Sequence, residues 1–164
     1  YIFINKQIFF NHNLFIDMNI DHICIAVRSI DRAIPRITDI FGYTQKTNKI
    51  TNTRQKVNVV FLEKQESIDI KLIEPSSSDS PLIEGLKKGE GLHHICFKTD
   101  KSVSLELDIL KQKGLRVLAD AEKGEAFDDE LIAFMYAGFG LNIELIDTDK
   151  RRGLINTLNN DGYT

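Results

Sequence analysis

The chain has few cysteines, no long apolar runs and little net charge. Its two cysteines, without a secretory pattern, favour a reducing cytoplasm over a disulfide framework. No run of about 18 apolar residues is present to cross a membrane. The net charge of -3 comes from mixed charges, whereas nucleic-acid binding requires a concentrated basic surface. We therefore expect a cytoplasmic protein that binds neither nucleic acid nor a membrane.

The amino-acid composition is that of an ordinary globular protein, with 42% apolar and 27% charged residues. A length of 164 residues is enough for one domain with a real core, or for two small halves that share one core. Residues 1–17 lack the positive start and the cleavage site of a signal peptide. We predict that they form an N-terminal extension and that the domain begins at Met18, with an extra edge strand as the alternative.

The string His-Ile-Cys occurs twice, in "DHICIAV" at residues 21–27 and in "LHHICFKT" at residues 92–99. The two copies are offset by 72 residues, from His22 to His94 and from Cys24 to Cys96. The apolar periodicity around each copy predicts the same order of elements, which is a strand, a helix and three more strands. An offset this long is outside the range of solenoid repeats, so it indicates two modules folded together.

We place the two modules at about residues 18–75 and 91–148, within a domain that covers residues 18–148 and precedes a tail at 149–164. The Pro- and Ser-rich loop "PSSSDSP" and a short helix separate the modules. Caps at Ser29 and Gly42 delimit the first helix. The strands are expected at residues 20–27, 43–50, 57–63, 67–75, 92–99, 115–120, 130–136 and 141–147, with a second helix at 102–114 and a Gly-rich loop before the strand at 130–136.

Three polar side chains of these strands are expected to lie on one face. Because side chains alternate across a strand, His22, His94 and Glu144 all project away from the helices. If the modules pair about a pseudo-twofold axis, two imidazoles and a carboxylate converge as a reasonable site for a divalent metal. A histidine in a β-rich segment is more often an ordinary core or surface residue. The same alternation predicts that His93 points away from the site.

The two cysteines lie next to these histidines on the same faces. Cys24 and Cys96 could contribute to a softer His/Cys zinc site. However, side chains two residues apart in a strand are about 7 Å from each other, which strains shared coordination. We interpret both as small buried residues near the floor of the cleft.

Several further motifs carry a family resemblance, namely "FGY", "VNVVFLE", "KLIEP", "GEGLHHICFKTD" and "IELID". With the two His-Ile-Cys strands, they resemble the vicinal oxygen chelate superfamily of glyoxalases, bleomycin-resistance proteins and extradiol dioxygenases, and within it the methylmalonyl-CoA epimerases. The resemblance covers about residues 18–147. It implies an α+β fold in which two βαβββ modules form an open cup-shaped mixed sheet with flanking helices. It also implies a homodimer and metal ligands at His22, His94 and Glu144.

The sequence departs from the family at Lys71, which stands where the resemblance implies a fourth ligand, a Glu or Gln. Three ligands could still hold a divalent metal ion such as cobalt, nickel, zinc, manganese or iron, with open positions for substrate. Alternatively, Lys71 replaces the charge of the metal or acts as a base. In a third interpretation the cup binds a ligand without chemistry. A snorkelling Lys71, or a strand register that is off by one, is the structural alternative. Glu144 and Lys71 are thus the candidate catalytic residues.

A second departure concerns the acid/base residue that the resemblance places near the second and third strands of the first module. Residues 44–58, "TQKTNKITNTRQKVN", contain no Asp or Glu. Four basic residues stand there instead, and they favour an anionic small-molecule substrate such as a CoA ester or a carboxylate. A solvated ribbon is the more common meaning of such residues, which are Lys46, Lys49, Arg54 and Lys56.

Together these features favour a methylmalonyl-CoA-epimerase-like or glyoxalase-like isomerase or lyase. It would depend on a metal and act through an enolate on a small carbonyl or acyl-CoA substrate. Two alternatives remain. One is a non-catalytic or metal-free small-ligand-binding protein of the same fold, with a role in resistance or biosynthesis. The other is a three-ligand iron enzyme similar to the dioxygenases.

Overall fold

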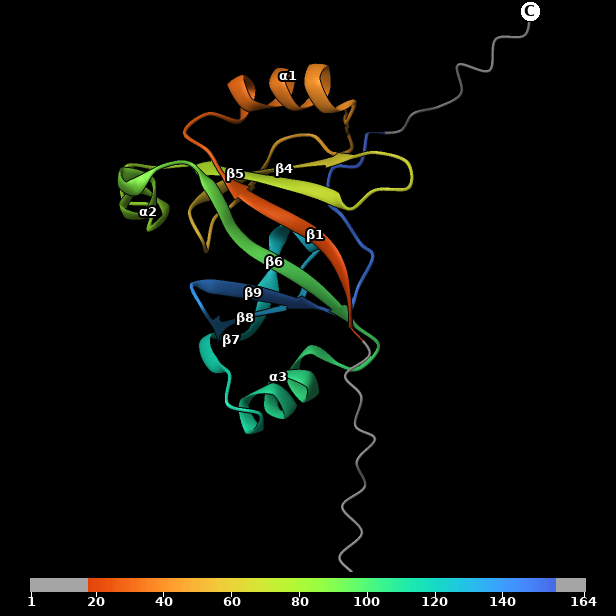
Figure 1. Cartoon of the computed structure of the whole chain (residues 1–164), viewed down its shortest axis with the longest axis vertical. Coiled ribbons are helices and arrows are strands. Elements are labelled where there is room, and N and C mark those ends of the chain that lie inside the picture. Colours follow the sequence, from red (N-terminus) through yellow and green to blue (C-terminus); the bar gives the residue numbers. More distant parts are fainter. Residues whose placement is uncertain (1–17, 156–164) are drawn as a thin grey trace, which may run out of the picture.

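The computed structural model describes residues 18–155. The predicted N-terminal extension at 1–17 and the final part of the predicted tail, residues 156–164, lie outside the described residues. Within the described range the chain forms one mixed sheet of nine strands with three α-helices (Figure 1). The predicted α+β class is confirmed.

The first module follows the predicted order, and its helix has the predicted ends. The Ser29 side chain accepts a hydrogen bond from the backbone N–H of Arg32, and Gly42 ends the helix with a φ of 70°. The predicted strand at 43–50 is instead two short strands, because each pairs separately with the same neighbouring strand. The elements are β1 (Met18–Ala26), α1 (Ile30–Phe41), β2 (Thr44–Gln45), β3 (Ile50–Asn52), β4 (Val57–Glu63) and β5 (Asp69–Pro75).

The second module repeats this order after a short helix. One strand is longer than expected and continues into the predicted Gly-rich loop, because its pairing with β8 extends to Gly124. A single 3₁₀ turn at Glu125–Phe127 completes that connection. The elements are α2 (Leu82–Lys88), β6 (Gly91–Thr99), α3 (Val103–Gln112), β7 (Arg116–Gly124), β8 (Glu130–Gly138) and β9 (Leu141–Ile146).

The sheet order shows that the two modules are equivalent. The strands run β2-β4-β5-β1-β6-β9-β8-β7, and β3 pairs with β4 off this path. At the centre β1 pairs antiparallel with β6, and each of them pairs in parallel with the last strand of its own module. Figure 1 shows α1 and α3 at opposite ends of the molecule. The two His-Ile-Cys segments are therefore equivalent central strands, as the repeat predicted.

Three apolar clusters form the core, one based in each module and one between the modules. One packs α1 against the outer face of β4 and β5, and a second packs α3 against β8 and β9. The third lies inside the cup and includes both cysteines together with Phe61 and Phe127. The last cluster surrounds the central strands on the face that carries His22 and His94. The site is thus built into a core and not onto a surface.

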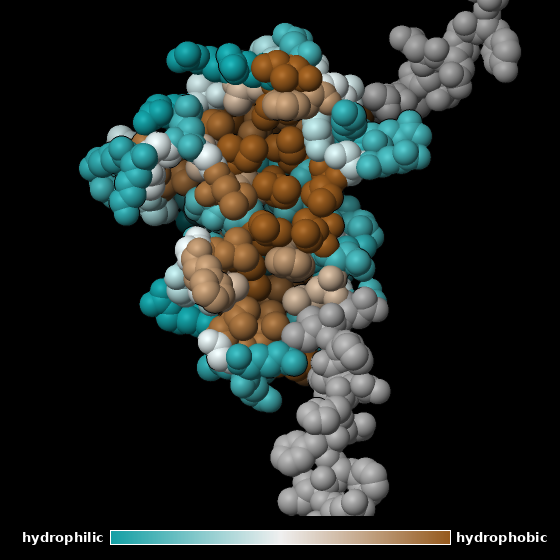
Figure 2. Space-filling view, viewed as in Figure 1, coloured by the Kyte–Doolittle hydropathy of each residue, from teal (hydrophilic) through white to brown (hydrophobic). Residues whose placement is uncertain are grey.

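The opposite face of the central strands is apolar and only partly covered. Figure 2 shows apolar side chains gathered on this face between α1 and α3. Ile20 on β1 and Leu92 on β6 are 42% and 62% exposed. Apolar surface of this kind commonly marks an interaction site.

The segment after β9 returns to the first module (Figure 1). Leu154 forms an isolated bridge with Thr47. Arg151 is buried, and its guanidinium lies over the rings of Phe61 and Phe127, at 4.8 and 4.7 Å from their centroids. Residues 149–155, which the sequence placed in a tail, thus contribute a side chain to the interior of the cup. None of the helices between residues 18 and 155 is long and apolar enough to span a membrane.

Candidate active site

Two β-bulges in equivalent positions shape the site. In the β1–β6 pairing Ile20 and His22 face consecutive residues of β6, so Asp21 is an extra residue in β1. In the same way His93 is an extra residue in β6, between Leu92 and His94. A bulge interrupts the alternation of side chains and can turn the extra residue toward its neighbour's face. Each site histidine is thus preceded by a residue that can reach its ring.

In β1 the extra residue orients the histidine. The Asp21 carboxylate lies 2.6 Å from His22 Nδ1 and also pairs with the buried guanidinium of Arg151. Burial acts to raise the pKa of Asp21, but the hydrogen bond from His22 and the charge of Arg151 outweigh it, so that the pKa is lowered. Since a carboxylate only accepts hydrogen bonds, Nδ1 of His22 carries the proton. The other ring nitrogen, Nε2, then points toward the centre of the cup, 3.0 Å from Glu144 Oε2.

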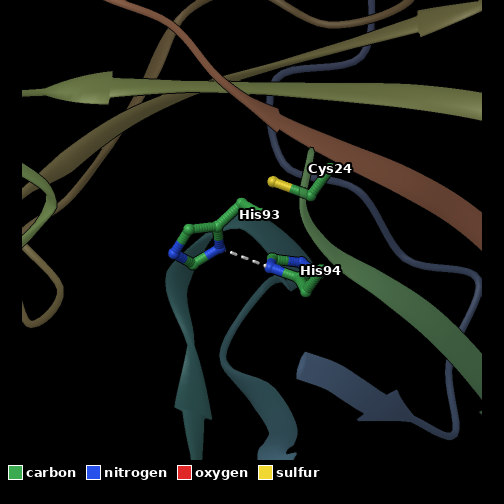
Figure 3. A group of neighbouring side chains, drawn as sticks. All are labelled: Cys24, His93 and His94. Atoms are coloured by element: carbon green, nitrogen blue, oxygen red, sulfur yellow. Dashed lines mark hydrogen bonds between the residues drawn. The ribbon is translucent and has the colours of Figure 1, made fainter. Parts of the chain in front are cut away.

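In β6 the extra residue is His93, and the prediction that it points away from the site is wrong. Its Nδ1 forms a hydrogen bond with Nδ1 of His94 (Figure 3), and the two atoms are 2.8 Å apart. The physical reason is the bulge, which the alternation rule does not anticipate. His94 Nε2 lies 3.0 Å from the Glu144 carboxylate and therefore donates to it. Nδ1 of His94 must then accept, so His93 donates its Nδ1–H and keeps a lone pair on Nε2.

The centre of the site is a buried ion pair. The ammonium of Lys71, on β5, donates to both carboxylate oxygens of Glu144, on β9, at 3.0 and 2.9 Å. The side chains are 4% and 0% exposed, so the interpretation of Lys71 as a snorkelling residue is wrong. A register error is also excluded, because Lys71 pairs with Cys24 and Glu144 pairs with Cys96 at equivalent positions of the two modules. The structure thus brings together all four residues predicted for the site.

The ion pair fixes the charges of its two members. Burial alone would lower the pKa of Lys71, but the Glu144 carboxylate outweighs it and raises this pKa. Burial would likewise raise the pKa of Glu144, yet the charge of Lys71 and the contacts with His94 and His22 hold it well below its usual range. Burial lowers the pKa of His94 to about 3. At neutral pH the centre therefore contains an ammonium, a carboxylate and a neutral imidazole.

Both cysteines are fully buried free thiols, as predicted. Cys24 lies close to His93 and His94 (Figure 3), and Cys96 lies close to Asp21 and His22, so each belongs to a group of potential metal ligands. Burial raises the pKa of both thiols. Because a thiolate is the form that binds metals, these two groups are poor metal sites at neutral pH.

A cleft of about 430 Å³ opens onto this cluster, within the range of ligand-binding pockets. Most of its wall is apolar, and Val57, Ile73, Leu82 and Phe134 contribute to it. The polar groups that line it come from both modules and are Arg54, Gln55, Lys71, His93, His94, Glu122 and Asn142.

The four basic residues of the β2–β4 segment have separate roles. Lys46 pairs with Asp69, Lys49 pairs with Glu74, and Lys56 pairs with Asp79. These three fit the interpretation of a solvated ribbon. Arg54 instead lines the cleft, and within the described residues it takes part in none of the ion pairs. Arg54 is thus the residue of this group that can meet an anionic ligand.

Three of the four groups at the centre have a geometry that fits a divalent metal ion. Glu144 Oε2 lies 3.0 Å from both His22 Nε2 and His94 Nε2, which is the separation expected of ligands at right angles around a metal about 2.1 Å away. The fourth group does not fit. An ammonium has no lone pair to offer, and that of Lys71 already engages both oxygens of Glu144. The set as it stands does not fit a divalent ion.

Comparison with known proteins relates this arrangement to one superfamily. Residues 21–134 match the model of the Glyoxalase/Bleomycin resistance protein/Dioxygenase superfamily. This range contains His22, Lys71 and His94, and Glu144 lies beyond it. The chain is also 36% identical over 117 residues to the uncharacterized protein YqjC of Bacillus subtilis (strain 168), covering 71% of this chain and 81% of that protein.

Two solved structures of methylmalonyl-CoA epimerases have a similar fold. One is a variant of the Streptomyces coelicolor enzyme in complex with 2-nitronate-propionyl-CoA, with a TM-score of 0.69, 29% identity, and coverage of 79% of this chain and 96% of that chain. The other is an epimerase in complex with methylmalonyl-CoA and NH4+, with a TM-score of 0.70, 28% identity, and coverage of 80% and 95%.

Proposed function

Because the chain belongs to the Glyoxalase/Bleomycin resistance protein/Dioxygenase superfamily, we propose that it is an isomerase acting through an enolate on a small anionic acyl thioester, such as an acyl-CoA. The observation that carries the proposal is the buried Lys71–Glu144 pair at the floor of a cleft. The two epimerases with similar folds bind CoA esters, one of them together with an ammonium ion. Like the end of the Lys71 side chain, that ion is an ammonium cation that donates N–H hydrogen bonds.

Lys71 supplies the charge that an enolate requires. Its ammonium has three N–H donors, and its two contacts with Glu144 leave one for a substrate oxygen in the cleft that Lys71 lines. A donor that is fixed and buried stabilises negative charge as it develops on that oxygen. Glu144 then acts by holding the ammonium in place, because its low pKa prevents it from taking up a proton.

Two other groups in the cleft can move the proton. Burial, followed by the charge of Lys71, lowers the pKa of His93, so its ring is neutral and its Nε2 can accept a proton. Glu122, on β7, lines the same cleft. An epimerase needs a proton acceptor on one side of the carbon and a donor on the other. We assign the acceptor role to Nε2 of His93 and the donor role to the protonated carboxyl of Glu122, in place of the acidic residue that residues 44–58 lack.

The test is solvent exchange into methylmalonyl-CoA. In D₂O, the purified protein should remove the proton between the two carbonyl groups, and proton NMR would show this signal disappear faster than in a sample without protein. His93→Gln and Glu122→Gln should each slow the exchange by about 10²–10⁴-fold. Lys98→Gln is the matched control, since Lys98 lies on the same strand as His93 and pairs with the exposed Asp149. Exchange no faster than in buffer, with this ester and with other acyl-CoA esters, would exclude the proposal.

The same experiment distinguishes the alternative of a binding protein without chemistry. That alternative is favoured by the absence of an acidic residue from residues 44–58. It predicts that the ester binds in calorimetry and that Arg54→Met weakens this binding, while no exchange occurs. Under the proposed enzyme, Arg54→Met should raise KM and change kcat little, because a charge that attracts the substrate acts equally on the ground state and the transition state.

We also propose that the protein works as a homodimer in the cytoplasm. The apolar face of β1 and β6 (Figure 2) is a surface that a second copy would cover. Analytical ultracentrifugation should give twice the mass of the chain, and Leu92→Lys should reduce it to that of one chain. A single-chain mass for the unchanged protein would contradict the dimer.

A further inference from the structure

The buried cluster has the geometry of a metal site without the charge of one. Members of the superfamily commonly bind a divalent metal ion, and His22, His94 and Glu144 form a candidate ligand group whose donor atoms lie within 4.8 Å of one another. Two histidines and one carboxylate are also the donor types that such ions prefer. The difference lies in the fourth group, which is Lys71.

The ammonium of Lys71 lies where a cation would contact the carboxylate. Its Nζ is almost equally distant from the two oxygens of Glu144, at 3.0 and 2.9 Å, and so occupies the fork between them. Its other side faces the ring of Phe127, 4.9 Å from the centroid, where the π electrons favour a cation. The carboxylate and the aromatic ring therefore both favour a positive charge at the position of Lys71 Nζ.

The charges of the interior are already balanced. Two buried cations, Arg151 and Lys71, face two carboxylates, Asp21 and Glu144. A divalent ion would add two positive charges beside a fixed ammonium, although both carboxylates of the buried cluster already have a cationic partner, at distances where a low dielectric makes repulsion costly.

We propose that the Lys71 ammonium takes the place of the divalent metal ion of the superfamily and that the remaining three donors form a metal site that Lys71 closes. His22 supports this inference. Its Nε2 is buried inside the cluster and lies 3.0 Å from Glu144 Oε2. The contact of Asp21 with Nδ1 fixes the ring so that its second nitrogen faces the cluster, which is the carboxylate–histidine arrangement that orients histidine ligands at metal sites.

The inference predicts that removing one charge restores metal binding. Lys71→Gln replaces the ammonium with a neutral amide that carries a carbonyl oxygen, and it frees Glu144 to bind a cation. The variant should take up stoichiometric cobalt and show its visible absorption, whereas the wild-type protein, after treatment with EDTA and dialysis against cobalt, should take up none. Lys98→Gln should behave as the wild type, and adding His94→Ala to Lys71→Gln should abolish the uptake.

Two results would overturn the inference. One is stoichiometric cobalt or iron in the wild-type protein that His94→Ala removes. The other is a Lys71→Gln protein that folds, as judged by circular dichroism, and binds no more cobalt than the wild type. If Lys71→Gln does not fold, the metal content of the wild-type protein alone decides. The measurement requires no substrate, so its failure and the failure of the proposed reaction are distinguishable.

Discussion

The Lys71–Glu144 pair should dominate the stability of the interior in a way that a double-mutant cycle can measure. The two variants are Lys71→Met, which keeps the length of the side chain, and Glu144→Gln, which keeps its shape. Each single change leaves the other charge buried, since the two side chains are 4% and 0% exposed. Breaking a buried pair in this way typically costs about 3–5 kcal/mol.

The surroundings of each partner determine which change costs more. In Lys71→Met the carboxylate keeps its hydrogen bond from His94, so we expect a loss near about 3 kcal/mol. In Glu144→Gln the ammonium keeps an amide oxygen and the rings of Phe127 and Phe61 but no negative charge, so we expect about 4 kcal/mol or more. The double variant contains neither charge and should lose about 4 kcal/mol, which gives a coupling energy of about 3 kcal/mol.

Urea denaturation followed by circular dichroism, with EDTA present to exclude metal ions, measures all four proteins of the cycle. The reasoning would be refuted if the two single losses added up in the double variant, because the groups would then not form the pair described here. It would also be refuted if Glu144→Gln were less costly than Lys71→Met.

Three other predictions concern the support of the site and the fold. Arg151→Met should lower the free energy of unfolding, measured with heat or urea, by about 3 kcal/mol, because it leaves the largely buried Asp21 carboxylate without its cation. The control Arg152→Met changes an exposed partner of two exposed carboxylates and should cost under about 0.5 kcal/mol. Equal losses would contradict the role of Arg151 as the buried partner of Asp21. Burial acts to raise the pKa of Glu74, but hydrogen bonds from the start of α1 and from two side chains lower it from 4.5. The stabilisation that the Glu74 carboxylate provides is therefore present above pH 4.5 and is lost as the pH falls through the lower pKa of the folded protein. The free energy of unfolding of Glu74→Gln should thus fall less on acidification than that of the wild type. Parallel curves of unfolding free energy against pH would contradict this. Gly124→Ala places a Cβ 2.8 Å from Ile132 Cγ2 and should cost about 1–3 kcal/mol of stability. Gly85 lies in a helix, where an added Cβ meets nothing within 4 Å, so Gly85→Ala should stabilise the protein by about 0.5–1 kcal/mol. The reverse order of stabilities would contradict the close packing around Gly124.

Most of the fold and the convergence of the site residues could be predicted from the sequence. The repeated His-Ile-Cys string identified the two central strands, and strand alternation placed His22, His94 and Glu144 on one face. These inferences succeeded because a strand period of two and a shared offset are properties of the chain itself. A nearly equal offset, of 73 residues, paired Lys71 with Glu144 before any contact between them was known.

The remaining features depend on contacts that no local pattern records. A β-bulge arises from the pairing of two strands, so alternation along one strand assigned His93 to the wrong face. Arg151 follows the last strand and is recruited to Asp21 only because the chain turns back to the first module. Glu122 carries no motif of its own, and it enters the cleft because β7 closes the sheet on that side. A comparison of the residues directly before the two repeated histidines, which are Asp21 and His93, would have identified Asp21 from the sequence.

The central claim is that an ammonium occupies the place of the metal, and anomalous diffraction tests it most directly. Crystals of the wild-type protein grown with cobalt would be measured at the cobalt absorption edge. The account predicts no anomalous peak between His22, His94 and Glu144, with the Lys71 amine in contact with both carboxylate oxygens. A strong peak at that point, with Lys71 turned away from Glu144, would contradict it.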